Sequence, residues 1–419
     1  MPPLSNWAGN VTYRARALHR PASVAELQQL VARSERVRAL GGGHSFSQVA
    51  DTAGDLVSVA GLPSRVDIDS ARSQARISAG LRYSDLAPRL DAAGFALANL
   101  ASLPHISVAG AVATGTHGSG DANRSLAAAV SAVELVTGGG ELRTVSRDGE
   151  PDSFPGLVVA LGACGVVTSL SLDLAPAFAV RQWVYGGVPF DALVAHLEEV
   201  TAAAYSVSVF TRWQPDRADQ VWLKSTGPSA QPPDGWLGGR LLSSQQHPVP
   251  GMPTEYVTQQ AGLPGPWHER LPHFRPDFTP SAGDELQSEF LLPRAHGRDV
   301  LLALDGVRHL IAPVLLVSEI RTVAADDLWL SPAYARDTIA IHFTWKPDAT
   351  ALAPVLAAVE GALEPFAPRP HWGKISTMPA AAVSARYPRL DDFRALVTRL
   401  DPAGTFRNEF TDAYLRPGA

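Results

Sequence analysis

Three consecutive glycines followed by a histidine, Gly41-Gly42-Gly43-His44, constrain the fold of this chain more than any other stretch. They follow a short apolar run over residues 37–40 that predicts a strand. Because glycine leaves the backbone bare, successive N–H groups of such a loop can close on a diphosphate. A tight turn ending in a solvated histidine explains these four residues equally well. The remaining sequence has to decide between a cofactor loop and a simple turn.

A second glycine-rich stretch, Ala101–Gly120, favours the cofactor loop. Its small side chains and hydroxyls do not fill a core, but they let the backbone approach a large, flat, polar ligand. A long irregular connector is the alternative, and a connector so free of charge and so rich in Gly, Ser and Thr is uncommon. The Rossmann and P-loop fingerprints and the hydrolase elbow are all absent from the sequence. We therefore predict a cofactor site of another type.

The bulk composition is that of a globular protein with two or three domains, since the 419 residues are 46% hydrophobic and 18% charged. A formal net charge of −6 argues against a nucleic-acid partner. We expect no membrane partner, because no stretch approaches the ~18 apolar residues of a spanning helix. The N-terminus lacks the basic start and apolar core of a secretory signal.

A single cysteine, Cys164, excludes an internal disulfide and a cysteine-based metal cluster. It lies in a glycine-rich apolar stretch, where we expect a small buried hydrophobe. The histidines fall into no zinc-binding pattern, so we predict no metal site. We expect a monomer in a reducing cytoplasm.

Residues 1–178 alternate short helices and short strands, which predicts a small α+β domain. Ser23 and Glu26 form a capping box that opens a helix to about residue 32, and Ser84 is predicted to cap a second helix over 85–93. A third helix is predicted over 153–162. The predicted strands cover residues 36–40, 55–60, 65–69, 75–79 and 166–174, with a hairpin over 132–136 and 141–145.

Residues 179–380 have a different sequence pattern and are predicted to form a second domain. Long alternating strands are expected there in an antiparallel sheet with one solvated face, at residues 205–213, 285–292, 314–323 and 338–345. Residues 225–284 are rich in Pro and Gly and predict long loops. We expect the last segment, 381–419, to return to the first domain.

Two of these strands carry polar pairs. A spacing of two places Glu319 and Arg321 on one strand face, and His342 and Thr344 on another. For either pair alone, a solvated sheet face is a sufficient explanation, because an exposed Glu–Arg pair is worth at most ~1 kcal/mol.

Lysine is rare in this chain, since only three of its 35 basic residues are lysines: Lys224, Lys346 and Lys374. Lys374 ends an aromatic segment that begins at Pro370. Lysine differs from arginine as a compact, titratable point donor. Its retention at position 374 indicates close contact with a reacting oxygen.

Together these motifs resemble the vanillyl-alcohol oxidase-type flavoenzymes, most closely the members that oxidise alditols. The resemblance covers nearly the whole chain and is carried by residues 6–10, 43–46, 101–120, 264–270, 319–325, 329–334 and 370–374. It implies an α+β fold, with a two-subdomain FAD-binding domain beside a substrate domain that contains a large antiparallel sheet. One departure is Gly42, where we expect serine in the closest relatives.

The resemblance also implies a site. It makes His44 the covalent link to the flavin and FAD the cofactor. The implied cofactor-binding residues are Gly41, Gly42, Gly43, His44, Ser45, Phe46, Ser102, Ser107, Gly110, Thr114, Gly115, His117, Gly118, Val166 and His371. The implied substrate-binding residues are Ser102, Glu319, Arg321, His342, Thr344 and Lys374, of which Arg321, Lys374, His342 and Glu319 are the predicted catalytic residues.

The implied activity is hydride transfer from the terminal C1 of an alditol such as xylitol, sorbitol or glycerol to flavin N5, with dioxygen as acceptor. The products are an aldose and hydrogen peroxide. A sugar-lactone or other carbohydrate oxidase on the same scaffold is the nearer alternative, and a non-catalytic flavin-binding protein is the second.

Overall fold

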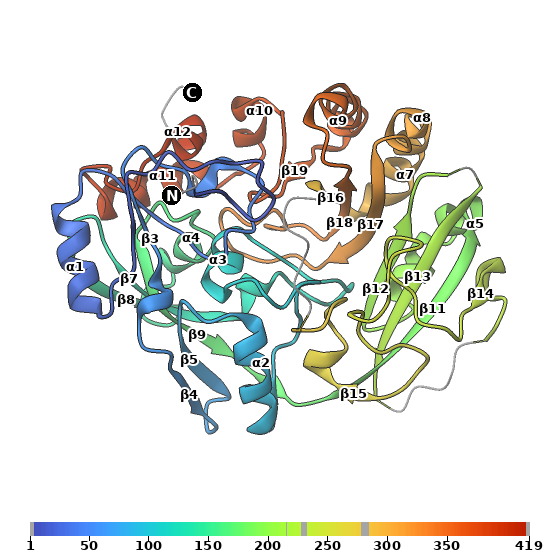
Figure 1. Ribbon diagram of the computed structural model, residues 1–419, viewed down its shortest axis with the longest axis horizontal. Coiled ribbons are helices and arrows are strands. Elements are labelled where there is room, and N and C mark those ends of the chain that lie inside the picture. The colour runs from blue at the N-terminus through green and yellow to red at the C-terminus, as the bar shows by residue number, and fades with distance from the viewer. Residues whose placement is uncertain (1–3, 215, 228–232, 278–284, 416–419) are drawn as a thin grey trace.

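The protein is described by a computed structural model that covers residues 4–214, 216–227, 233–277 and 285–415. Helices and strands combine in two parts that lie side by side (Figure 1). The N-terminal part, blue to teal, contains several small sheets, and the second part, green to orange, is built on one large sheet. The predicted α+β class is confirmed.

The N-terminal part holds a three-stranded parallel sheet in the order β1-β3-β2 and a five-stranded antiparallel sheet in the order β4-β5-β9-β7-β8. A short pair, β6 with β10, lies beside them. The strands are β1 Leu18–His19, β2 Val37–Ala39, β3 Asp55–Val57, β4 Val66–Asp69, β5 Gln74–Ser78, β6 Phe95–Ala96, β7 Val130–Val136, β8 Leu142–Ser146, β9 Val166–Asp173 and β10 Ala175–Pro176. The strands and the hairpin predicted for this region are therefore present.

Four helices accompany these sheets: α1 Val24–Arg33, α2 Tyr83–Ala92, α3 Val108–Ala113 and α4 Phe154–Val158. The predicted cap of α1 is confirmed, since Ser23 Oγ accepts from the N–H of Glu26 at 3.2 Å. The predicted cap of α2 is wrong: Arg82 is its N-cap residue, and Ser84 lies inside the helix.

Two further expectations for this region are corrected. α4 ends at Val158 rather than at 162, because Leu161 and Gly162 have positive φ values of 53° and 67°, which no helix accommodates. α3 lies inside Ala101–Gly120, which was predicted as a cofactor loop, so a short helix interrupts that loop.

The second part contains a nine-stranded antiparallel sheet in the order β14-β11-β13-β12-β17-β18-β16-β19, with β15 paired to β11. Its strands are β11 Ala179–Pro189, β12 Ser206–Thr211, β13 Arg217–Thr226, β14 Arg240–Leu241, β15 Gly265–Pro266, β16 Leu286–Pro293, β17 Leu315–Val323, β18 Thr338–Trp345 and β19 Arg369–Pro370. Its helices are α5 Phe190–Ala195, α6 Leu197–Ala202, α7 Gly297–Gly306, α8 Arg308–Ile311 and α9 Ala349–Leu363. Short 3₁₀ turns cover Gln48–Ala50, Val59–Gly61, Leu126–Ala129, Trp236–Gly238, Trp267–Glu269, Arg294–His296 and Glu364–Phe366.

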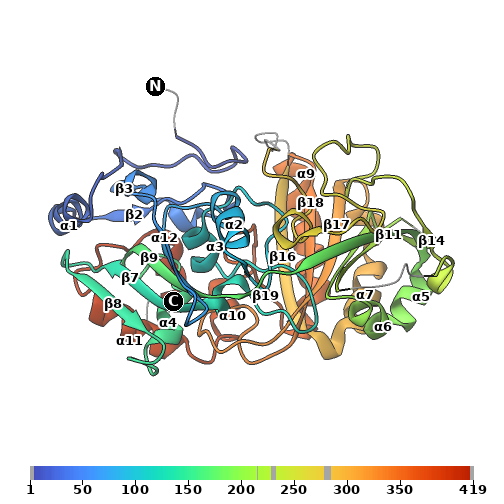
Figure 2. The same cartoon turned by 90° about the horizontal axis from the view of Figure 1, so that it is seen from below.

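The expectation of a solvated sheet face is wrong. β12 and β18 are buried along their whole length, and β16 and β17 nearly so. Ile341, Phe343 and Trp345 on one face of β18 share a core with apolar residues of α7 and α9. α5 and α7 lie on the side of the sheet away from the N-terminal part (Figure 2). The opposite face of β16–β18 is therefore turned toward the N-terminal part.

α9 also corrects the expectation that no stretch approaches a membrane-spanning helix. Within the described chain, residues 349–366 form one helix long and apolar enough to cross a membrane, with a mean hydropathy of 1.2. Buried side chains such as Leu356 and Val359 pack this helix into the core. A core helix of a globular protein meets the same criterion.

The C-terminal helices, α10 Ala380–Ser384, α11 Leu390–Leu400 and α12 Glu409–Leu415, lie against the N-terminal part (red in Figure 1). The N–H of Val37 donates to Thr405 O at 2.9 Å, and Asn408 Nδ2 donates to Asp51 O at 2.8 Å. The buried Arg38 adds bonds to Phe406 O at 2.9 Å and to Gly162 O at 3.0 Å. These bonds tie the C-terminal segment to the region around the strand that precedes the glycine triplet. The domain boundaries at 178 and 380 stay predictions.

Candidate active site

A cavity of about 610 Å³ is lined by residues of both parts. The two glycine-rich loops form one wall, and strands β16–β18 with the segment after β19 form another. The predicted residues that line it are Gly41, Gly42, Gly43, His44, Ser45, Phe46, Ser102, Ser107, Gly110, Thr114, His117, Glu319, Arg321, His342, Thr344, His371 and Lys374.

The two glycine-rich loops touch at Ser107. Its Oγ accepts from the N–H of Gly42 at 3.2 Å. A Cβ on Gly41 would lie 2.5 Å from this oxygen, and a Cβ on Gly110 would lie 2.6 Å from it. A side chain at either position would displace the Ser107 hydroxyl, and with glycine both loops present bare backbone to the cavity.

His44 lies at the rim of this backbone surface. Its Nδ1 is 3.0 Å from Gly42 O, and its ring stacks on Trp7 at 5.4 Å between centroids. Burial lowers the pKa of His44 to about 4, so the imidazole is neutral. Nε2 is buried and has no hydrogen-bond partner among the described residues.

These features fit the FAD that the sequence predicted. Bare backbone faces the cavity from two sides, and a neutral imidazole has a buried nitrogen without a protein partner. Cys164 lies in the same wall, and burial raises the pKa of its thiol. It is therefore the small buried hydrophobe that was predicted.

The reacting wall is a row of side chains across three neighbouring strands. His342 on β18 pairs with Glu319 on β17 and with Glu289 on β16. Two residues further along, Thr344 is opposite Gln287. Because residues paired across antiparallel strands point to the same face, all these side chains reach the cavity together.

Arg321 is held by two carboxylates. Its Nη2 donates to Glu289 Oε1 at 2.6 Å, and its Nε lies 3.6 Å from Glu319 Oε1. Burial alone would raise the pKa values of both carboxyls, but Arg321 together with the neighbouring histidines outweighs burial and holds both pKa values below their usual range. The cluster is therefore ionised, with one positive charge on Arg321 between two carboxylates.

Glu289 gathers two histidines as well. His117 Nε2 lies 3.2 Å from its Oε1, and His342 Nδ1 lies 3.5 Å from its Oε2. His342 Nε2 is also 3.2 Å from Thr344 Oγ1. Burial lowers the pKa of His342, although Glu289 opposes this, so we assign a neutral imidazole.

Lys374 is a cation with a different environment. Its Nζ donates to the amide oxygen of Gln287 and lies 5.0 Å from the centroid of the Phe46 ring. Burial lowers the pKa of Lys374 to about 8.

The N–H of Phe46 donates to Gly373 O at 2.7 Å, which joins the histidine loop to the lysine segment. His371, in that segment, accepts from the N–H of Gly373 at Nδ1 and lines the cavity.

Three predicted cofactor residues do not line the cavity: Gly115, Gly118 and Val166. A Cβ on Gly115 would meet Pro332, and one on Gly118 would meet Asn99, so both glycines serve packing. The Val166 side chain belongs to a separate core, and its neighbours Gly165 and Val167 line the cavity instead.

The polar residues that the sequence analysis did not place at the cavity include Glu289, Gln287, His273 and Lys224. Glu289 and Gln287 alternate on a strand that was predicted, so their spacing of two was a usable signal. The rarity of lysine marked Lys224 on β13, whereas His273 carried no signal in the loop-rich region. No group of three or more His, Cys, Asp or Glu side chains suited to hold a metal ion occurs in the described ranges.

Comparisons with known proteins show the family of this chain. Residues 15–146 match the family described as FAD binding domain, and residues 284–414 match the family described as D-arabinono-1,4-lactone oxidase. The chain is 53% identical to an alditol oxidase of a Streptomyces species, over 97% of each chain. It is 30% identical to the L-gulono-1,4-lactone dehydrogenase of Mycobacterium tuberculosis, over 99% of each.

A solved structure of cholesterol oxidase from B. sterolicum superposes with a TM-score of 0.76 at 16% identity, and covers 99% of this chain and 96% of its own. At that identity the likeness concerns the fold alone. It extends over both parts of the molecule.

Proposed function

Because this chain belongs to the vanillyl-alcohol oxidase-type family of FAD flavoproteins, we propose that it is an FAD-dependent oxidase of alditols. The observation that carries this proposal is the row Glu319–His342–Glu289, with Thr344 and Gln287 alongside, on the cavity wall. A neutral polyol offers only hydroxyl groups as handles, and this row provides donors and acceptors for a linear series of them.

Oxidation of the terminal CH₂–OH removes a hydride from carbon and a proton from oxygen, leaving an aldehyde. FAD, when bound, supplies the hydride acceptor at N5 and passes two electrons to dioxygen, which becomes hydrogen peroxide. The chain itself has to bind the polyol, orient its C1 and manage the hydroxyl proton.

We propose that Lys374 stabilises the negative charge that develops on the substrate oxygen. Arg321 already faces two carboxylates, whereas Lys374 contacts the neutral amide oxygen of Gln287. An ammonium without a bound counter-charge gains most from an oxygen that becomes anionic. Arg321 then serves to keep Glu289 and Glu319 ionised and in place.

The hydroxyl proton has acceptors on the same wall. The neutral imidazole of His342 and the carboxylate of Glu319 both line the cavity. Ser102 and Thr344 add hydroxyl groups for the remaining substrate oxygens.

We further propose that His44 is bonded covalently to the flavin. The support is its neutral ring, with a buried nitrogen that no described residue engages. Cytoplasmic location, a monomeric state and release of hydrogen peroxide belong to the same proposal. The single cysteine, Cys164, is compatible with a reducing compartment.

The experiment is a visible absorption spectrum of the purified protein before and after anaerobic addition of xylitol. A yellow protein bleached by xylitol, with peroxide formed on readmitting air, supports the proposal. A yellow protein bleached by L-gulono-1,4-lactone and not by xylitol points to the lactone oxidase, a reading favoured by the family matched at residues 284–414. A yellow protein bleached by neither substrate leaves the non-catalytic flavin-binding protein open as an alternative.

A further inference from the structure

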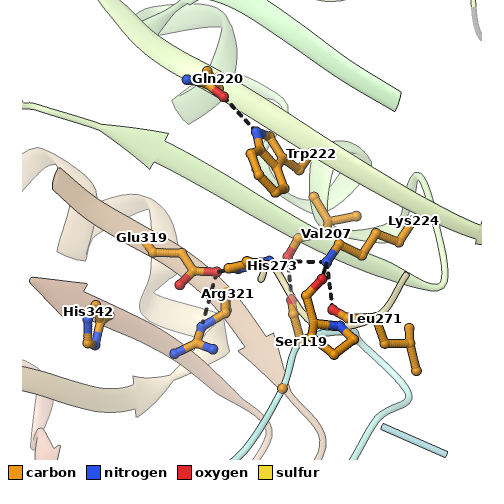
Figure 3. A network of polar contacts seen from close by, with 12 residues as sticks. Ser119, Val207, Gln220, Trp222, Lys224, Leu271, His273, Glu319, Arg321 and His342 are labelled. Carbon is orange, nitrogen blue, oxygen red and sulfur yellow. Dashed lines mark hydrogen bonds and ion pairs between the residues drawn. The ribbon is translucent and has the colours of Figure 1, made fainter. Parts of the chain in front are cut away.

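Lys224, one of the three lysines of the chain, is almost completely buried, with 1% of its surface exposed. It lies on β13, two strands away from Glu319. Its Nζ is 2.6 Å from Leu271 O, 3.1 Å from Pro272 O and 3.1 Å from His273 Nδ1 (Figure 3). Burying a charged amine is costly, so a chain that otherwise uses arginine has kept this lysine for a specific contact.

His273 connects Lys224 to the active site. Its Nε2 lies 2.8 Å from Glu319 Oε1, and the imidazole lies between the lysine and the carboxylate (Figure 3). Burial and the charge of Lys224 lower the pKa of His273 to about 4, so the ring is neutral and carries one proton. That proton sits on either Nδ1 or Nε2.

The contacts decide between the two tautomers. Both carbonyl oxygens at Lys224 are acceptors, and an ammonium has a third N–H for His273 Nδ1. Nδ1 therefore accepts, and the proton of His273 is on Nε2, where it donates to Glu319. In the other tautomer the lone pair of Nε2 would face the carboxylate at 2.8 Å and repel it.

The orientation of the imidazole is fixed from other directions as well. Phe210 and Trp222 contact the ring edge to face, at centroid distances of 5.5 and 5.2 Å. Trp222 is held in turn, since its Nε1 donates to Gln220 Oε1 at 2.7 Å. The N–H of His273 donates to Ser102 O at 3.0 Å, which links this segment to the second glycine-rich loop.

We propose that Lys224 is a positioning residue for the substrate site: its ammonium selects the Nε2–H tautomer of His273, which holds Glu319 in one orientation at the cavity wall. This proposal rests on the proposed function, because Glu319 is the group that meets the polyol. Lys224 and His273 act only through Glu319.

The tautomer is measured without any substrate, by NMR of protein labelled with ¹⁵N-histidine. The signal of His273 is identified by its loss in His273→Asn. We expect the Nε2–H form in the wild type and its loss or exchange broadening in Lys224→Met. An Nδ1–H form in the wild type overturns the proposal.

Steady-state kinetics test the consequence for binding. Lys224→Met is expected to raise KM for xylitol about tenfold with little change in kcat, because a contact to the bound ground state is weakened. His273→Asn, whose amide does not reach Glu319, should behave alike. His273→Gln places an amide N–H near the position of Nε2 and should restore most of the affinity. An equal rise of KM in His273→Asn and His273→Gln contradicts the proposal. This comparison does not need the Lys224→Met variant and holds even if that variant fails to fold.

Lys346→Met is the matched control, since Lys346 Nζ also donates to a backbone carbonyl, Pro313 O at 2.7 Å, but is exposed and has no part in the site. Its KM should equal that of the wild type.

A double-mutant cycle separates positioning from general stabilisation. In the Glu319→Gln background, adding Lys224→Met is expected to change KM less than about twofold, since the partner is already altered. Full additivity of the two effects overturns the proposal. If the Nε2–H tautomer is found but xylitol is not oxidised, the proposed function fails and the link from Lys224 to Glu319 stands.

Discussion

Glu289 and Arg321 stand on strands β16 and β17, which are separated by β18, yet their side chains meet at 2.6 Å across the middle strand. Their ion pair passes over the strand that carries His342. One carboxylate thereby fixes the arginine and lies beside His342 and His117. Glu289 is the centre of the polar wall, although it was not among the predicted site residues.

Replacing Glu289 by Gln should lower both stability and activity. Arg321 would lose one buried counter-charge, a type of change that costs about 3 kcal/mol. We expect a lower thermal midpoint and slower reduction of the flavin by xylitol in stopped-flow. The control is Glu364→Gln, because Glu364 is solvent-exposed and its pair with Arg386 should be worth less than about 1 kcal/mol. If Glu289→Gln reduced its flavin at the wild-type rate, Glu289 would have no role in the reaction.

His44→Ala should bind FAD without a covalent bond. After acid precipitation, the wild type should keep its yellow colour in the pellet, and the variant should release its flavin into the supernatant. The physical reason is the neutral imidazole, whose pKa burial lowers to about 4. Release of all flavin from the wild type would refute the covalent link and leave FAD binding intact.

Lys374→Met should slow flavin reduction at saturating xylitol by about 10²–10³, the usual effect of losing a donor to developing charge. FAD content should change far less than the rate of reduction, because the side-chain hydrogen bond of Lys374 goes to Gln287 and its contact with the histidine loop is with the Phe46 ring. Arg321→Met should also lower the thermal midpoint, since it leaves Glu289 and Glu319 buried without their cation. If Lys374→Met reduced its flavin at the wild-type rate, a group other than Lys374 would stabilise the negative charge on the substrate oxygen.

The pH dependence follows from two buried lysines. Burial lowers the pKa of Lys374 to about 8 and that of Lys224 to about 7. Both are needed as ammonium groups, so kcat/KM is expected to be highest below pH 7 and to fall as the pH rises through these two values. In Lys374→Arg the decline near pH 8 should vanish, and in Lys224→Met the decline near pH 7. A profile that rises over this range would contradict both roles.

Substrate preference should follow the linear layout of the polar row. Each missing hydroxyl leaves a buried partner unpaired at about 1–3 kcal/mol, so xylitol and sorbitol should exceed glycerol mainly in kcat/KM. A γ-lactone holds its hydroxyls in a compact ring and should react slowly. Initial rates of peroxide formation give the comparison, and faster turnover of a lactone than of xylitol would reverse the assignment.

Gly43 and Gly42 should differ in their tolerance of a side chain. Gly43 has a φ of +70°, where an L-residue costs about 1–2 kcal/mol. A Cβ on Gly42 would lie 3.4 Å from His44 Nδ1, close to ordinary contact. Gly43→Ala should therefore lower the temperature of flavin release more than Gly42→Ala does, as followed by flavin fluorescence.

Local patterns predicted those parts of the fold that local chemistry determines. Ser23 predicted the start of α1, and the spacings Glu319/Arg321 and His342/Thr344 predicted which side chains share a strand face. The alternating pattern wrongly suggested that this face is exposed to solvent. The face is buried because the N-terminal part of the chain covers it, and a strand's own sequence does not encode that contact.

Local sequence patterns do not predict the register in which strands pair or the contacts between distant segments. Glu289 reaches the site because β16 pairs with β18 at His342, and no sequence spacing encodes that register. β11 and β13 were not among the predicted strands, although β13 pairs with the predicted β12 and β11 pairs with β13. His273 follows a Pro- and Gly-rich segment, and its importance comes entirely from Lys224 and Glu319 on distant strands.

The origin of the cavity walls has a consequence for how such proteins diversify. The cofactor side consists mostly of loops before residue 120, where Gly41 and Gly110 lie close to the Ser107 side chain. The reacting side consists of strand residues whose side chains are replaceable within an unchanged sheet. A lineage can therefore exchange one substrate for another by single substitutions on β16–β18 while its redox machinery is inherited intact. Relatives named for an alditol at 53% identity and for a sugar lactone at 30% are the outcome expected of such a division.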